Sequence, residues 1–318
     1  MPGPSVDDSQ IPCAAMPLDD ARLFHVNVNC SDLERSCRFY TEGIGLEIGA
    51  RTAPETAQPG AAFGLDRARW DASILLGPRG YDGGAVDLLQ WQEPAPVGAP
   101  PTRLFQTGFQ RLGLRVPDLD GALVRVGALG GAVWSEPVTH TLAAGGEIRL
   151  TMVNDPDGTA IELIEGGAAA LSFVAVTCAD LERSLDFYVS LGFREVARYP
   201  SENADGSHLH VEGTVAMDEI VLTAPGGGDV LFILVGFRAP LCERNSARAA
   251  NTLGMWRAAF LIADVDKAVA ELARHDVATI SPPVEMAMGP GLPNLRFVCF
   301  RGPDDEVVEL IEQPALDR

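Results

Sequence analysis

CSDLERSCRFY at residues 30–40 returns as CADLERSLDFY at residues 178–188, and the two stretches are identical at eight of eleven positions. Alternating apolar residues precede each copy, which predicts a β-strand leading into a helix. Ser31 is the expected N-cap of the first helix, with Glu34 completing a capping box, and Asp180 is the expected N-cap of the second. The chain therefore repeats a strand–helix unit.

A weaker repeat follows each copy and divides the chain into four parts. The closing segments NDPDGTAIELIEG (154–166) and RGPDDEVVELIEQP (301–314) each carry turn residues between two apolar stretches. We therefore expect four modules, each consisting of a strand, a helix and three further strands (βαβββ). They span residues 22–93, 108–166, 171–236 and 255–314.

The order of these elements predicts the fold class and the domains. Three strands after one helix do not form a doubly wound parallel sheet, and the chain has neither GxGxxG after a strand nor a Walker A sequence. We expect an α+β protein in which consecutive modules share a cupped mixed sheet. This predicts a disordered leader over residues 1–20, a first domain over 21–167 and a second over 168–318.

Composition excludes several classes of partner. The 318 residues carry a net charge of −20, which disfavours binding to nucleic acid or to an anionic membrane. No apolar run has the length of a transmembrane helix, and residues 1–20 lack the pattern of a signal peptide. The six cysteines form no CxxC pair, so we expect free thiols in a reducing compartment. We expect a cytoplasmic protein, either a monomer or a homodimer.

Modules that open with HV.V...DLERS..FY and close with DPDG..IEL.E resemble the vicinal oxygen chelate superfamily, also called glyoxalase/bleomycin-resistance/extradiol-dioxygenase proteins. The resemblance extends over nearly the whole chain and implies two vicinal-oxygen-chelate domains. It also implies a divalent ion (Zn, Mn, Ni, Co or Fe) held by the first and last strands of two modules. Such an ion binds two neighbouring oxygens of a small substrate and stabilises an enediolate.

The resemblance places His25 and Asp87 at the ligand positions of module one. In module two it places Arg111 where a second histidine is usual, and Glu162 at the last-strand position. Arginine stays protonated and has no acceptor atom, so it cannot bind a metal. The expected metal ligands are therefore His25, Asp87 and Glu162, and Arg111 is expected to hold a substrate oxygen.

The last two modules have lost most of these ligand positions, which implies one site per chain. Phe173 and Arg257 stand at the histidine positions, and only Glu309 remains as a carboxylate. In some relatives the cup forms between non-consecutive modules, and the set would then be His25, Asp87, Arg257 and Glu309. The sequence leaves both pairings open, so Arg257 is also a candidate for binding substrate.

Two further assignments complete the expected site. Glu162 or Glu309 is expected to act as the catalytic base. His140, at the end of the stretch SEPVTH, lies near the expected rim and is a candidate base or additional ligand.

The resemblance implies a metal-dependent isomerase or epimerase acting at the carbon next to a ketone. Tandem chains of this length with one site resemble cyclitol epimerases of the 2-epi-5-epi-valiolone epimerase type. A metal-free binding or self-resistance protein is the alternative, because arginine replaces the second histidine. An extradiol-type dioxygenase is less favoured, because those members use two histidines and a glutamate in the C-terminal half, where Phe173 and Arg257 stand.

Overall fold

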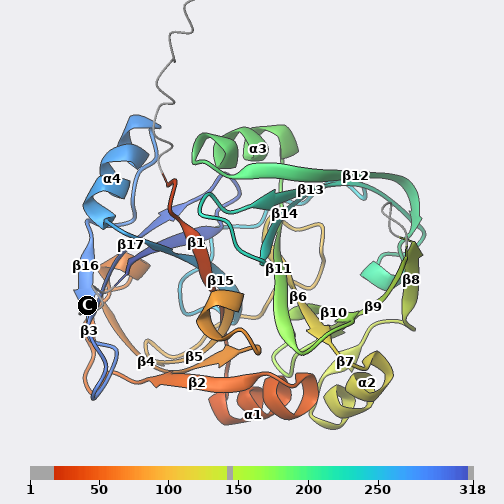
Figure 1. Ribbon diagram of the computed structural model, residues 1–318, viewed down its shortest axis with the longest axis horizontal. Coiled ribbons are helices and arrows are strands. Elements are labelled where there is room, and N and C mark those ends of the chain that lie inside the picture. The colour runs from red at the N-terminus through yellow and green to blue at the C-terminus, as the bar shows by residue number, and fades with distance from the viewer. Residues whose placement is uncertain (1–17, 142–145, 314–318) are drawn as a thin grey trace, which may run out of the picture.

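The computed structural model describes residues 18–141 and 146–313, which form two nine-stranded curled sheets (Figure 1). The first sheet has the order β16-β17-β18-β15-β1-β5-β4-β2, with β3 beside β4. The second has the order β12-β13-β14-β11-β6-β10-β9-β7, with β8 beside β9. Each sheet is mixed and cupped, which confirms the predicted fold class.

The first sheet contains modules one and four. Module one comprises β1 (Arg22–Asn29), α1 (Leu33–Arg38) with a π-helical extension η1 (Phe39–Ile44), β2 (Glu47–Thr52), β3 (Gln58–Pro59), η2 (Ala61–Phe63), β4 (Arg67–Leu76), η3 (Gly80–Gly83) and β5 (Ala85–Glu93). Module four comprises β15 (Gly254–Ile262), α4 (Val265–Arg274), β16 (Val284–Met286), β17 (Leu295–Arg301) and β18 (Val307–Glu312).

The second sheet contains modules two and three. Module two comprises β6 (Gly108–Val116), α2 (Leu119–Ala128), β7 (Ala132–Val133), β8 (Val138–Thr141), β9 (Glu147–Asn154) and β10 (Ala160–Glu165). Module three comprises β11 (Ala170–Thr177), α3 (Leu181–Ser190), β12 (Arg194–Asp205), η4 (Ser207–Leu209), β13 (Thr214–Thr223) and β14 (Leu231–Ala239).

The prediction that consecutive modules share a sheet is wrong, and the alternative pairing of module one with module four is observed. The seam of each sheet is an antiparallel pair of first strands, β1 with β15 and β11 with β6. The link from β10 to β11 is short, so modules two and three stay adjacent and meet where β6 pairs with β11. The boundary expected at residues 167 and 168 therefore falls inside one sheet.

The predicted leader overlaps the described residues at positions 18–20. Residues 1–17 lie outside the described residues. Leu18 and Ala21 are 2% and 0% exposed and belong to the main apolar cluster. Residues 18–20 are therefore part of the folded body.

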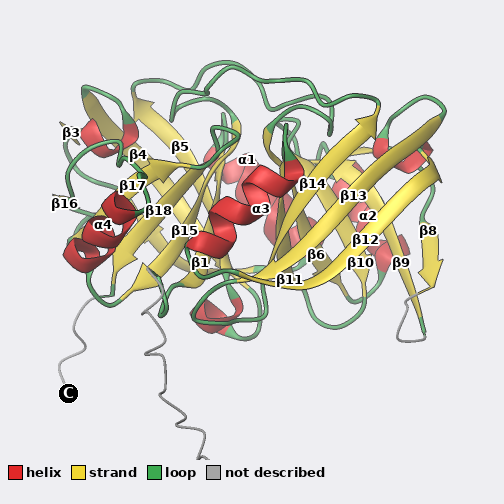
Figure 2. Cartoon of the chain, turned by 90° about the horizontal axis from the view of Figure 1, so that it is seen from above, coloured by secondary structure: helices red, strands yellow, loops and turns green. Residues whose placement is uncertain are grey.

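The two sheets share one core and open in different directions. The largest apolar cluster joins them, with Val26 and Val28 of β1 and Leu112 and Leu114 of β6 among its members. Figure 2 shows the two sheets side by side. Separate clusters line the concave faces, one around Phe63 and the other holding further apolar side chains of the second sheet. Side chains alternate along a strand. Because Val26 and Val28 of β1 face the shared core, the residues next to them on β1 face the first cup.

An aspartate caps each of the four α-helices. The side chains of Asp32, Asp118, Asp180 and Asp264 each accept a hydrogen bond from the backbone N–H three residues on. The expected cap at Asp180 is confirmed. The expected cap at Ser31 is wrong, because this residue is turned toward another module.

The repeated opening and closing motifs contact each other across the two sheets. Asp157, in the closing turn of module two, accepts hydrogen bonds from the Ser31 N–H at 2.9 Å and hydroxyl at 2.6 Å. Asp304, in the closing turn of module four, accepts from the Ala179 N–H and the Ser184 hydroxyl, both at 2.8 Å. Each closing turn thus fixes the start of a helix that belongs to the other sheet.

Each of these contacts also buries a carboxyl group against a tyrosine. The Tyr40 hydroxyl donates to Asp155 at 3.1 Å, and the Tyr188 hydroxyl donates to Glu306 at 2.6 Å. The two acids stand at opposite ends of their turns. A Cβ on Gly302, the residue equivalent to Asp155, would overlap the Glu306 carboxyl group. In both turns a carboxyl group therefore fills the same space, but it comes from a different position of the turn.

We expect the unfolding free energy of the chain to fall as pH rises from about 4.5 to about 7. Burial raises the pKa of Glu306 from 4.5 to about 7, so in this window the folded state holds a proton that the unfolded state has released. Glu306→Gln should reduce that loss by up to about 3 kcal/mol. Urea titrations across the window measure it, with Glu55→Gln at an exposed position as the control. Equal pH profiles for Glu306→Gln and the unsubstituted chain would contradict the assignment.

Two features of the described residues bear on the expected compartment. No helix among them is long and apolar enough to span a membrane. Their five cysteines form no disulfide. Cys13, the sixth, lies outside the described residues.

Candidate functional site

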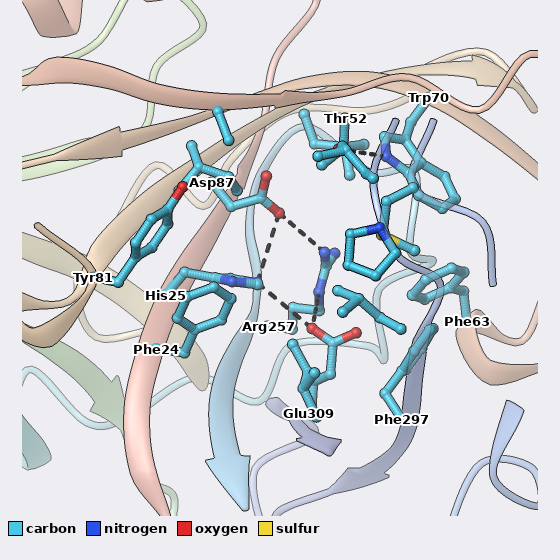
Figure 3. Close-up of a pocket in the computed structure, with 18 residues that line it drawn as sticks. Phe24, His25, Thr52, Phe63, Trp70, Tyr81, Asp87, Arg257, Phe297 and Glu309 are labelled. Atoms are coloured by element: carbon cyan, nitrogen blue, oxygen red, sulfur yellow. Dashed lines mark hydrogen bonds and ion pairs between the residues drawn. The ribbon is translucent and has the colours of Figure 1, made fainter. Parts of the chain in front are cut away.

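The cup of the first sheet brings together one side chain from each of four strands. His25 comes from β1, Asp87 from β5, Arg257 from β15 and Glu309 from β18 (Figure 3). Their exposed fractions are 5%, 3%, 5% and 3%. This is the alternative set that the sequence left open, and it groups two residues near the start of the chain with two near its end.

Arg257 bridges the two carboxylates. Its Nε donates to Glu309 Oε2 at 2.8 Å, and its Nη2 donates to Asp87 Oδ2 at 3.0 Å. His25 Nε2 lies 3.5 Å from Glu309 Oε2 and 3.7 Å from Asp87 Oδ2. The four side chains therefore form one compact polar cluster at the floor of the cup.

Two irregularities in the seam aim neighbouring side chains into the cup. The pairing of β1 with β15 shifts register between Leu23 and His25, which leaves Phe24 as an extra residue. It shifts again opposite Val26 and Val28, at Trp256 and Arg257. A bulge lets two consecutive residues face the same side of a sheet. Phe24 and His25 consequently both line the cavity.

Charge compensation keeps Glu309 ionised. Burial raises the pKa of this carboxyl group, but the positive charge of Arg257 and the neighbouring His25 outweigh it and lower the pKa to about 2. The same pairing raises the pKa of Arg257 despite its burial, through Glu309 and Asp87. The guanidinium–carboxylate pair is therefore fully charged at neutral pH.

Several polar atoms of the cluster have no hydrogen-bond partner in the described part of the chain. These are both ring nitrogens of His25, Nη1 of Arg257 and Oδ1 of Asn27. Buried polar atoms are nearly always paired, so unpaired ones at the floor of a cavity indicate a position for a ligand. Asn27 donates to Asp87 at 3.3 Å and so helps to orient that carboxylate.

A cavity of about 240 Å³ lies above this cluster. Its floor is polar, whereas its walls are aromatic and aliphatic, including Phe63, Trp70 and Phe297. The segment containing Met288 and Leu292, between β16 and β17, also lines it. Figure 3 shows the aromatic rings standing on both sides of the charged groups.

The cup of the second sheet repeats one part of this cluster and has lost the rest. Arg111 Nε donates to Glu162 Oε2 at 2.8 Å, the same atoms and distance as in the pair of Arg257 and Glu309. Phe173 replaces the histidine, and its ring fills the space beside Gly113. The Arg111 guanidinium takes its second carboxylate from Glu219 of β13, at 2.6 Å. The arginine–glutamate pair is thus shared by both cups.

Three sequence-based expectations need correction. Glu162 does not join His25 and Asp87, because β10 belongs to the second sheet. Arg111 forms ion pairs with two carboxylates in that second sheet. His140 lies exposed on β8, with its ring centroid 5.9 Å from that of His208, and does not line the cavity. Asn27, by contrast, was missed, although its place two residues after His25 puts it on the same strand face.

Comparison with known proteins identifies the fold of the whole chain. The model of the glyoxalase/bleomycin resistance protein/dioxygenase superfamily matches residues 22–163 and 170–310. The chain belongs to this superfamily. The crystal structure of glyoxalase I from Zea mays superposes with a TM-score of 0.65 at 19% identity, covering 92% of each chain. At that identity the superposition supports the shared fold alone.

Relatives in sequence are lactoylglutathione lyases. An Arabidopsis thaliana lactoylglutathione lyase is 29% identical over 184 residues, which cover 55% of this chain. The matched region is 56% of that enzyme, so the chain spans about half the length of this curated relative. Lactoylglutathione lyase is an isomerase-type enzyme. Isomerase-type enzymes of this superfamily use divalent metal ions.

The donor atoms of the first cup suit a divalent ion, with one position replaced. One imidazole and two carboxylates are accepted ligands for such ions. The distances from His25 Nε2 to the carboxylates, 3.5 and 3.7 Å, are close to the roughly 3.4 Å between two ligands bonded at about 2.1 Å to a tetrahedral ion. Among the described residues, no group of three His, Cys, Asp or Glu side chains is already arranged to hold an ion. Arg257 stands where the sequence resemblance led us to expect a histidine ligand.

Proposed function

We propose that the cup of the first sheet is the active site of an isomerase that moves a proton at the carbon next to a ketone. The observation that carries this proposal is the meeting of His25, Asp87 and Glu309 beneath one cavity, with both nitrogens of His25 unpaired. His25, Asp87 and Glu309 would hold a divalent ion there. The chemistry that such an ion supplies is polarisation of a substrate carbonyl, which makes the neighbouring C–H more acidic.

The residues of the cup would divide the remaining tasks. Glu309, on β18, is the proposed proton acceptor and also the group that returns the proton, because Asp87, on β5, only accepts hydrogen bonds, from Arg257 and Asn27. A pKa of about 2 keeps Glu309 ionised but makes it a weak base. Proton removal therefore depends on an acidified substrate and on walls that exclude water.

Arg257 is proposed as a positioning residue. It holds both carboxylates through separate N–H groups, and the same pairing of arginine with glutamate occurs in the second cup, where Phe173 takes the place of the histidine. The repeated pair indicates a structural task. Its unpaired Nη1 remains available to a substrate oxygen.

The more specific assignment to a cyclitol epimerase finds no support in the cavity walls. A polyhydroxylated ring needs hydrogen-bond partners around its whole edge, and unpaired hydroxyl groups are costly to bury. The walls offer mainly aromatic and aliphatic side chains. An extradiol-type dioxygenase is also disfavoured, because the cup of the first sheet has one histidine where such sites use two.

One observation favours a second candidate, a metal-free binding protein. Arg257 already supplies a positive charge to both carboxylates that would bind the ion. In this alternative the cavity would bind a small molecule without chemistry. Metal content separates the two candidates.

We expect the purified chain to retain about one divalent ion per molecule after dialysis against metal-free buffer. The variant His25→Ala should lose this ion, and it should also lose solvent-deuterium exchange into 2-hydroxyketones. Removal of one protein ligand leaves too few donors for a stable site. Elemental analysis and mass spectrometry of recovered substrate measure the two effects. Glu162→Gln is the control, because this residue lies in the other cup. Absence of stoichiometric metal, with exchange unaffected by a chelator, would favour the binding protein.

A further inference from the structure

We infer that the first cup takes an uncharged ligand with one aromatic ring and two neighbouring oxygens at one end. This inference rests on the proposed function, since it names the substrate class of the same site. The oxygens would face His25 and Arg257, whose unpaired nitrogens lie at the polar floor. The ring would lie against the aromatic walls shown in Figure 3.

The first argument concerns hydrogen bonding at the walls. The Trp70 indole N–H donates to the Thr52 hydroxyl at 3.0 Å, so this pair satisfies itself. Trp91 and Trp256 pack behind the wall residue Phe63, and their N–H groups donate to Asn29 and to the Arg248 carbonyl. The indole rings therefore present apolar surface, and the polar groups that line the cavity besides the floor cluster are Thr52 and the Tyr81 hydroxyl.

The second argument concerns charge. Arg257 is the one Lys or Arg among the residues that line the cavity, and two of its nitrogens are already bonded to Asp87 and Glu309. The cluster carries two carboxylates against one guanidinium. A glutathione conjugate carries two carboxylates and an ammonium group, and none of these would find a partner along the walls. Buried charges without partners are strongly disfavoured.

The third argument concerns size. A protein cavity of about 150 Å³ lined by apolar side chains binds benzene. A cavity of about 240 Å³ therefore has room for one ring with a few further atoms. A longer, peptide-bearing thioester exceeds this space.

A comparison within the chain shows that several aromatic positions of this cup are not aromatic in the second. The bulge position Phe24 corresponds to Ser172 in the second sheet, and Trp256 corresponds to Gln110. Phe63, at the end of η2, corresponds to Leu209 at the end of η4. Phe63 makes edge contacts with Trp91 at 5.6 Å. The second cup carries rings at other positions, among them Phe173 and Phe237, so the two cups place their aromatic side chains differently.

The test uses three probes that differ in aromatic ring, charge and size. They are 2-hydroxyacetophenone (ring, uncharged), dihydroxyacetone (no ring, uncharged) and S-lactoylglutathione (charged, large). Tryptophan fluorescence, which reports on Trp70 in the wall, and calorimetry measure binding with and without added Mn²⁺. We expect the aryl ketone to bind at least tenfold more tightly than dihydroxyacetone, and lactoylglutathione to show no saturable binding.

Two matched variants tie binding to this cavity. Leu292→Asp puts a charge beside the cavity at a residue that is 37% exposed, and should weaken aryl binding at least tenfold. Leu241→Asp makes the same change at a residue that is 77% exposed and lies outside the cavity lining, and should leave binding unchanged. Both positions are exposed enough for the fold to tolerate the change.

The outcomes separate this inference from the proposed function. Aryl binding without solvent-deuterium exchange would support the substrate class and overturn the isomerase. Exchange with dihydroxyacetone or binding of lactoylglutathione, at equal or higher affinity than the aryl ketone, would overturn the substrate class and leave the isomerase standing. Failure of the aryl ketone to bind at all would also overturn the inference.

Discussion

Arg257→Met is expected to lower the unfolding free energy by about 3–5 kcal/mol, and a divalent metal ion is expected to restore most of the loss. The substitution leaves Asp87 and Glu309 buried without the guanidinium that now bonds to both. Breaking a buried ion pair by removing one partner has this cost because the remaining charge is uncompensated. An ion at the same carboxylates supplies the missing positive charge. Urea denaturation with and without Mn²⁺ or Zn²⁺ measures both effects.

The second cup provides a control of the same chemistry. Arg111→Met also removes a guanidinium between two carboxylates, but the Glu162 and Glu219 side chains are 13% and 22% exposed, against 4% for each carboxylate in the first cup. We expect a smaller loss there and no recovery with metal. Equal recovery of both variants would mean that the ion acts elsewhere on this acidic chain.

Arg257→His is expected to raise metal affinity by at least about tenfold. The substitution would put a second imidazole at the position from which Arg257 now reaches Asp87 and Glu309. With His25, Asp87 and Glu309 this would complete a set of two imidazoles and two carboxylates, the number of protein ligands that holds Zn²⁺ in closed tetrahedral sites. Competition with a chromophoric chelator measures the affinity of the variant and of the unsubstituted chain.

Arg111→His is the matched control for this gain. Phe173 stands at the histidine position of the second cup, so a new imidazole there joins Glu162 and Glu219 alone. We expect no comparable gain. If Arg257→His binds metal no more tightly than the unsubstituted chain, residue 257 does not stand at a ligand position, and the three-ligand proposal loses its geometric basis.

The order of elements could be predicted from sequence because it depends on local signals. Alternation identified β1 and β11, and Asp180 identified a helix start. Ser31 failed as a cap because two polar residues compete at that helix, and the side chain of Asp32 is the one that reaches the free N–H. Local chemistry narrows the choice to neighbouring residues but does not decide between them.

The pairing of the modules could not be predicted, because it depends on which first strands meet. Before the modules pair, one edge of β1 is free, and either β6 or β15 could pair there. Both of these strands carry an arginine at the same position. The bulges at Phe24 and Trp256 add a second difficulty, since an extra residue changes which side chains face the cup. Sequence alternation alone would have turned one residue of each pair away from the cavity.

The bond between Arg257 and Glu309 could have been anticipated. β15 runs parallel to β18 in register, with Arg257 beside Val307 and Ala259 beside Glu309. Glu309 is therefore within reach of a long side chain two residues away on the neighbouring strand. The signal in the sequence was the recurrence of arginine and glutamate at matching places in modules two and four.

The antiparallel pairing of β1 with β15 also determines when the first sheet can form during synthesis. Arg22 pairs with Leu261, so β1 leaves the ribosome long before its partner strand β15. The second sheet, made of the two middle modules, can close before the first. Until β15 emerges, β1 presents an open edge, which invites pairing with other chains. The candidate site thus forms only after β15 and β18 have been synthesised, and chains that stop before residue 254 carry His25 and Asp87 without the half that completes it.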